Sequence, residues 1–173
     1  TADREGAPHM AVPADAVRGC SWRDCSTYSP GRPATRVAPH GGLTPVFTPD
    51  PLAFGVPTSG EPVLIDLSAS LTTNGMTARL HRQGRKLAHP WLLDAAGRAT
   101  DDPAALFVEP KGTILPTGGV DAGHKGYALA LIVEMLTGGL AGFGRADPKE
   151  GWGATVLVQA YDPAAFGGTA ACL

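Results

Sequence analysis

An α+β fold is predicted for this chain of 173 residues from three features of its sequence. Two apolar runs of strand length, residues 63–67 and 155–159, are rich in β-branched side chains and leucine, and the first is typical of a strand buried on both faces. One longer apolar segment begins at Gly126 and is apolar on every face except at Glu134, which predicts a helix buried on every side. Glycine (23 residues) and proline (16) are abundant, which predicts short elements joined by many turns.

Shorter segments add to this outline. Residues 52–56 have the composition of a short strand, which Pro57 would end because proline has no amide donor. Apolar and polar residues alternate over 76–81, which predicts a half-exposed strand. Asp102 followed by Pro103 is typical of a helix start with the aspartate as N-cap. Residues 1 to about 34 show little periodicity of either kind.

Composition and charge exclude several classes of protein. An apolar share of 43% suits a single globular domain, and a net charge of -2 with mixed signs gives no nucleic-acid footprint. No apolar run is long enough to span a bilayer, and residues 1–20 lack the core of a signal peptide. The three cysteines fit neither a zinc site nor a disulfide framework. These observations predict a cytoplasmic protein with no membrane or nucleic-acid partner.

The segment that carries most chemistry is GGVDAGHKGY, residues 118–127, which leads into the apolar helix. Free N–H groups at a helix start carry partial positive charge, and Lys125 adds a full one. Together they predict a binding site for a phosphate or carboxylate. Because glycine has no side chain, such a ligand could approach the backbone closely. The alternative is a loop that merely turns into a buried helix, and the spacing alone does not separate the two.

Four motifs follow one another along the chain: TPDPLAFGVP (48–57), LIDLSAS (64–70), PTGG (116–119) and HKGY (124–127). Further similar stretches are HPWL (89–92), GRATDDP (97–103) and GWG (151–153). In this order they resemble the type-2 malate/L-lactate dehydrogenase family, which includes sulfolactate and ureidoglycolate dehydrogenases. The resemblance covers roughly residues 29–168. It implies one domain over this range, a poorly patterned segment over 1–28 and a tail over 169–173.

The resemblance implies a mostly antiparallel sheet with flanking helices that binds NAD or NADP in a non-Rossmann manner. The absence of a G-x-G-x-x-G motif after a strand agrees with this expectation. It further implies a homodimer that transfers a hydride between the nicotinamide and a small 2-hydroxy or 2-oxo acid of the malate, lactate or sulfolactate type. Family members are longer chains, so the fold is expected to be incomplete at both ends.

The same resemblance names the residues of a cofactor site. They are Ser29, Asp66, Leu67, Ser68, His124, Lys125 and Gly126. Contacts from His124 and Lys125 to the phosphates or ribose of the cofactor would agree with the anion-binding site predicted from the helix start. For Asp66 the alternative is a carboxylate that caps a turn at the end of its strand.

The resemblance also implies a histidine that transfers the hydroxyl proton, a role that suits histidine because its pKa lies close to neutrality. His9 holds the corresponding place in the order of motifs, although Met10 and Ala11 stand where the family has a Phe-Gly pair. The alternative is an exposed histidine near a terminus. His40 and the other two histidines of the middle region are expected at the surface, and no metal site is predicted.

Two rival functions stay open from the sequence. The chain could be an inactive, truncated remnant that retains only dinucleotide-binding or dimer contacts. It could also be a plain anion-binding module that uses residues 118–127 alone.

Overall fold

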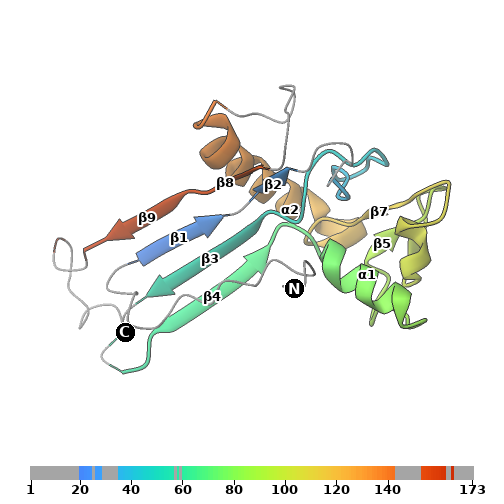
Figure 1. Cartoon of the computed structure of the whole chain (residues 1–173), viewed down its shortest axis with the longest axis horizontal. Coiled ribbons are helices and arrows are strands. Elements are labelled where there is room, and N and C mark those ends of the chain that lie inside the picture. Colours follow the sequence, from blue (N-terminus) through green and yellow to red (C-terminus); the bar gives the residue numbers. More distant parts are fainter. Residues whose placement is uncertain are drawn as a thin grey trace, which may run out of the picture.

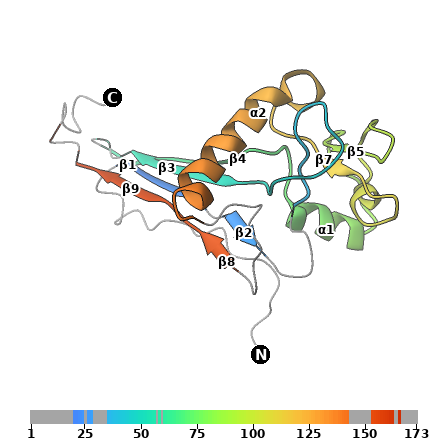
Figure 2. The same ribbon diagram turned by 90° about the horizontal axis from the view of Figure 1, so that it is seen from above.

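The computed structural model of the chain describes residues 20–24, 26–28, 35–56, 58, 60–142, 153–162 and 165. An extended sheet occupies one side of the molecule, a smaller lobe of short strands and helices the other, and a long helix lies between them (Figures 1 and 2). This mixture of sheets and helices agrees with the predicted α+β class.

The extended sheet has four antiparallel strands in the order β4-β3-β1-β9. Its strands are β1 (Cys20–Asp24), β3 (Pro51–Val56), β4 (Val63–Ser68) and β9 (Val158–Tyr161). The predicted strand over 52–56 is confirmed and begins one residue earlier. Its partner β4 runs back beside it, with Asp66 opposite Ala53 and Ser68 opposite Pro51.

The strand predicted over 63–67 is confirmed, but its predicted burial on both faces is wrong. Strand β4 lies at an edge of the four-stranded sheet and has a single strand neighbour. Its apolar side chains are exposed on both sides of the pleat, with 55% of Leu64 and 45% of Ile65 accessible to solvent. An apolar run therefore predicted the strand correctly without predicting its place in the sheet.

Two smaller sheets complete the strand pairing of the described residues. Strand β2 (Ser26–Tyr28) pairs with β8 (Gly153–Thr155), and β5 (Leu92–Leu93) lies between β6 (Ala99–Thr100) and β7 (Thr113–Ile114). The single strand predicted over 155–159 is wrong, because β8 and β9 are separate strands that belong to different sheets. Strands β1 and β2 lie in a region where the sequence predicted no element.

The strand predicted over 76–81 is also wrong, since these residues form helix α1 (Asn74–Arg82). The hydroxyl of Thr73 caps the helix by accepting a hydrogen bond from the Met76 amide at 3.1 Å. Thr77 is fully buried, and Thr73 and Leu80 are half-buried, so the inward positions follow a spacing of three and four residues. The apparent alternation was a helical face sampled at too few positions.

The long central helix is α2 (Gly119–Glu134), which continues into a π-helical turn, η3 (Met135–Gly139). The helix begins seven residues before the predicted start at Gly126. It is buried on one face only, through Gly123, Gly126, Ala130 and Val133. Leu131 and Ile132 are each 45% exposed, so the predicted burial on every side is wrong. Among the described helices, none has both the length and the apolar character needed to cross a membrane.

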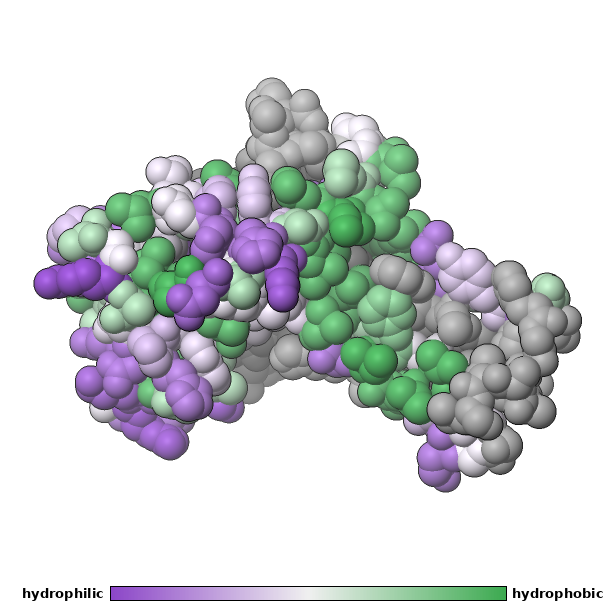
Figure 3. All heavy atoms as spheres, turned by 180° about the vertical axis from the view of Figure 1, so that it is seen from behind, coloured by the Kyte–Doolittle hydropathy of each residue, from purple (hydrophilic) through white to green (hydrophobic). Residues whose placement is uncertain are grey.

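The core lies in the smaller lobe and beneath α2. Its buried apolar members are Val37, Phe47, Ala69, Leu87, Leu92, Leu106, Ile114 and Ala130. Asp102 caps the 3-10 helix η2 (Pro103–Leu106) by accepting from the Ala104 amide at 2.9 Å, which confirms the predicted start. Seen from behind, apolar side chains gather over the middle of the molecule and polar ones over the lobe (Figure 3).

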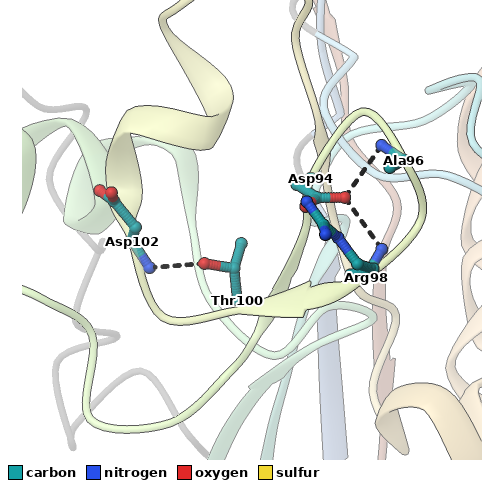
Figure 4. Close-up of polar contacts among 5 residues, drawn as sticks. All are labelled: Asp94, Ala96, Arg98, Thr100 and Asp102. Atoms are coloured by element: carbon teal, nitrogen blue, oxygen red, sulfur yellow. Dashed lines mark hydrogen bonds and ion pairs between the residues drawn. The ribbon is translucent and has the colours of Figure 1, made fainter.

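The lobe also contains a tight turn organised by one carboxylate. Asp94 accepts hydrogen bonds from the amides of Ala96 and Arg98 at 2.9 and 3.0 Å, and the Arg98 guanidinium pairs with its second oxygen (Figure 4). These contacts close the connection between β5 and β6. They hold the pKa of Asp94 below its usual value, the Arg98 amide having the largest effect.

Candidate functional site

Six of the sequence-predicted site residues lie on two elements, and the other two fall outside the described residues. Asp66, Leu67 and Ser68 form the carboxyl end of β4, and His124, Lys125 and Gly126 lie in α2. His9 and Ser29 are the two outside the description.

Thr117 joins the end of β4 to α2. Its hydroxyl donates a hydrogen bond to the Ser68 carbonyl at 2.9 Å, and its amide donates to the Ala69 carbonyl at 2.8 Å. Its own carbonyl accepts from the Gly126 amide at 3.0 Å. Through this one residue the backbone of Ser68 and that of Gly126, 58 positions apart in sequence, are held in a fixed relation. The two predicted halves of the site therefore meet at one corner of the molecule. This corner consists of the end of β4 (Asp66, Leu67 and Ser68), Thr117, and His124, Lys125 and Gly126 of α2.

Gly126 is required at this corner by packing. A Cβ built at this position would lie 2.4 Å from the Thr117 amide nitrogen, 2.5 Å from its carbonyl oxygen and 2.7 Å from the Ala69 carbonyl oxygen. No side chain fits at such distances, because real Cβ contacts begin beyond about 3 Å. The glycine thus lets α2 touch the segment that follows β4.

The prediction that residues 118–127 form an open glycine-rich segment, with the helix beginning only at Gly126, is wrong. Residues 119–134 are helical, and Gly123 and Gly126 are buried against the protein. The segment nevertheless contains a helix start, at an earlier position than predicted. Gly118 has a left-handed conformation (φ 101°) and begins the helix, which is then interrupted at Ala122, where φ is -125° and ψ is 19°.

The interruption at Ala122 makes 119–121 a separate first turn, so His124 and Lys125 stand at the start of the regular part of the helix. Both side chains are exposed. A helix start favours negative charge nearby, and an exposed ammonium group adds to that preference. An anion is therefore the ligand that this end of α2 favours, with Asp121 as the opposing charge in the first turn.

The end of β4 offers different chemistry. Asp66 is exposed and Ser68 is half-buried, with the Ser68 hydroxyl donating to the Ser70 carbonyl at 2.9 Å. A carboxylate accepts hydrogen bonds from hydroxyl groups such as those of a ribose. Leu67, which is 37% exposed, lies between them in the strand and presents its apolar side chain on the opposite face. The corner thus combines a carboxylate, an apolar side chain and a cation.

A third segment braces the corner and was not predicted as part of it. The Ala69 amide donates to the Pro49 carbonyl at 2.8 Å, and the Thr48 hydroxyl bonds to the buried carboxylate of Asp50. Asp50 adopts φ 45°, a left-handed conformation that is costly for a residue with a side chain. The Thr48-Pro49-Asp50 sequence was visible within a family motif, but nothing in it indicated that the carboxylate is buried.

Across the described ranges, no three His, Cys, Asp or Glu side chains are grouped so that they could hold a metal ion. The histidine predicted to transfer a proton, His9, lies outside these ranges. The exposed Asp66 and Lys125 side chains at the corner are suited to binding hydroxyl groups and an anion.

Comparison with known proteins identifies the relatives of this fold. A sequence model of the malate/L-lactate dehydrogenase family matches residues 9–173. The chain is 37% identical over 134 residues to the L-sulfolactate dehydrogenase of Methanothermobacter thermautotrophicus, covering 73% of this chain and 37% of that protein. It is 35% identical over 170 residues to the (2R)-3-sulfolactate dehydrogenase (NADP(+)) of Chromohalobacter salexigens, covering 93% and 49%.

A solved structure shows the same relationship. The fold resembles delta1-piperideine-2-carboxylate reductase from Pseudomonas syringae with a TM-score of 0.61 at 32% sequence identity, over 87% of this chain and 44% of that one. The chain thus spans half or less of the length of these relatives. Because the family's sequence model matches nearly the whole chain, the protein belongs to the malate/L-lactate dehydrogenase family.

Proposed function

We propose that this chain is the cofactor-binding portion of an oxidoreductase that transfers a hydride between NAD or NADP and a small 2-hydroxy or 2-oxo acid. The observation that carries the proposal is the corner in which Thr117 ties the end of β4 to α2. This junction holds an exposed carboxylate on one element and an exposed cation on the other. A dinucleotide has ribose hydroxyls and phosphates that match the two groups.

The roles of the corner residues follow from their chemistry. Lys125 and His124 would bind the phosphates or a ribose, and Asp66 would accept hydrogen bonds from ribose hydroxyls. Leu67 would offer an apolar contact, while Ser68 and Gly126 would hold the two backbones in register. The nicotinamide would supply the hydride, and the protein would supply binding and orientation. His9 is the residue we propose for the proton, and Ser29 for a further cofactor contact.

The family relationship supports the substrate class. The relatives named above act, by their names, on sulfolactate or on piperideine-2-carboxylate. In a 2-oxo acid and in such a cyclic imine, the carbon that receives hydride is next to a carboxylate. We therefore extend the proposed substrates from malate, lactate and sulfolactate to cyclic 2-imino acids. We further propose a non-Rossmann fold and a homodimer, as the family resemblance implies.

The test is a titration of the purified chain with NADPH and with NADH, followed by cofactor fluorescence. Pyruvate, oxaloacetate, sulfopyruvate and a cyclic imino acid are then added to detect oxidation of the cofactor. Lys125→Ala should weaken binding about tenfold, because a hydrogen bond to a charged group contributes about 1.5 kcal/mol.

Lys86→Ala is the matched control for that titration. Lys86 is an exposed lysine that follows α1 and pairs with Asp101 at 2.9 Å, and it contributes no group to the proposed site, so its loss should leave affinity unchanged. Binding with turnover supports the whole proposal, and binding without turnover favours the inactive remnant. Failure to bind either nucleotide would overturn it.

A further inference from the structure

His40 lies in a tight turn outside the motifs that carry the family resemblance. The Gly42 amide donates to the Pro39 carbonyl at 2.9 Å, and Gly41 has φ 80°. These features define a turn in which the third residue must tolerate a left-handed conformation, as in type II turns. The turn fixes the backbone of His40 independently of α2.

The turn places His40 against the start of the regular part of α2. The ring centroids of His40 and His124 are 5.7 Å apart, and the rings meet edge to face at 70°. A Cβ built at Gly123 would lie 2.8 Å from the His40 Nδ1 atom and 2.9 Å from the Pro116 Cγ atom, so the glycine lets this imidazole lie close against the helix. Two independent contacts therefore hold the ring of His40 beside His124.

We propose that His40 is a positioning residue for the dinucleotide site. It holds the imidazole of His124 in one orientation at the start of α2, where His124 meets a phosphate or ribose of the cofactor. This inference rests on the function proposed above. An edge-to-face contact favours one rotamer of an otherwise exposed ring. A side chain ordered before binding does not lose that freedom on binding, so the cofactor binds more tightly.

Three substitutions separate this role from direct contact with the cofactor. His40→Phe keeps an aromatic ring without nitrogen atoms, His40→Gln keeps a polar side chain without a ring, and His40→Ala keeps neither. Positioning predicts that the phenylalanine variant binds NADPH like the parent chain. The glutamine and alanine variants should bind about two- to tenfold more weakly. A glutamine variant that binds better than the phenylalanine variant would overturn the proposal.

A double substitution tests whether His40 acts through His124. In a chain that already carries His124→Ala, the further change His40→Ala should leave the affinity for NADPH unchanged. An equal loss in both backgrounds would mean that His40 acts on its own, which contradicts the proposal. His81→Ala is the matched control, because His81 also contacts an aromatic ring, that of Phe107 at 4.8 Å, but lies in α1 and not beside α2.

A measurement without cofactor distinguishes this proposal from the function on which it rests. Three-bond NMR couplings about χ1 of His124 should report one rotamer in the parent chain and in His40→Phe, and averaging in His40→Ala. Averaged couplings in the parent chain would overturn the positioning role alone. Ordered couplings in a chain that binds neither NADPH nor NADH would instead overturn the proposed function.

Discussion

The amide nitrogen of Thr117 lies so close to Gly126 that a Cβ on the glycine would stand 2.4 Å away from it. This contact lets helix α2 rest directly on the segment that follows β4, and the Gly126 amide hydrogen-bonds to the Thr117 carbonyl at 3.0 Å. The position of His124 and Lys125 relative to Asp66 therefore depends on a glycine that carries no chemistry of its own. The first prediction concerns this residue.

Gly126→Ala should destabilise the fold by about 1–3 kcal/mol, the usual cost of forcing a methyl group into a packed contact. The free energy of unfolding, measured with urea, checks this value. Because the neighbouring atoms are backbone, the helix itself must shift, and affinity for NADPH should fall in the same variant.

Gly75→Ala is the control for that substitution. Gly75 is also helical, but a Cβ there meets nothing within 4 Å. Alanine restricts the unfolded chain more than glycine does, so this variant should be more stable by about 0.4–1 kcal/mol. Equal effects of the two substitutions would contradict the packing argument.

Thr117→Val tests the hydroxyl half of the same junction. The variant loses the hydrogen bond to the Ser68 carbonyl but keeps the backbone contacts to Ala69 and Gly126. Since Thr117 is exposed and water can replace the lost donor, we expect a loss of stability of about 0.5 kcal/mol. Affinity for the cofactor should fall as well, because the end of β4 is held less firmly.

Thr117→Ser restores the hydroxyl and serves as the rescue variant. Its affinity and unfolding free energy should lie near those of the parent chain. If serine and valine weaken cofactor binding equally, the hydroxyl contact does not position the end of β4.

Asp94→Asn should change how stability depends on pH. Hydrogen bonds from the Arg98 amide, from its guanidinium and from the Ala96 amide lower the pKa of Asp94 in the folded state below 3.8. A lowered pKa means that the charged form favours folding, so its contribution is present above the unfolded pKa and is lost as the pH falls through the folded one. The parent chain should therefore melt at a higher temperature than the variant at pH 7.

The difference between the two melting temperatures should shrink as the pH falls below about 4, since the parent carboxylate then becomes protonated. Thermal unfolding followed by circular dichroism at pH 7 and pH 3 measures it. Glu61→Gln, at an exposed glutamate near the start of β4, is the control for the loss of one carboxylate. A gap that stays constant between the two pH values would contradict the assigned role of the charge.

The sequence predicted those parts of the fold in which local signals and tertiary packing agree. Asp102 before Pro103 gave a correct capped start, and the apolar run of 63–67 gave a correct strand. The exposure of this strand, β4, could not be predicted, because its position at the edge of the sheet depends on which strands pair with β3. Periodicity describes the surface a segment offers and contains no information about its neighbours.

In the candidate site, too, the sequence predicted the elements but not the contacts between them. The family resemblance named residues on β4 and α2, and the structure brings these two elements together through Thr117. The sequence did not indicate Thr117 as the link, since a single hydroxyl has no pattern of its own. His40 was expected at the surface, and it is exposed, but its contact with His124 could not be predicted because it spans 84 positions of the chain.

Thr73→Ala tests the helix that replaced a predicted strand. The Thr73 hydroxyl accepts from the Met76 amide at 3.1 Å, and removing an N-cap of this kind costs about 0.5–2 kcal/mol. The amides of α1 should then exchange with deuterium faster, whereas Thr73→Ser, which keeps the hydroxyl, should protect them as in the parent chain. Unchanged exchange in the alanine variant would show that the Thr73 hydroxyl does not stabilise the start of α1. Cofactor affinity should be unaffected, because α1 belongs to the lobe and contributes no group to the corner of Thr117.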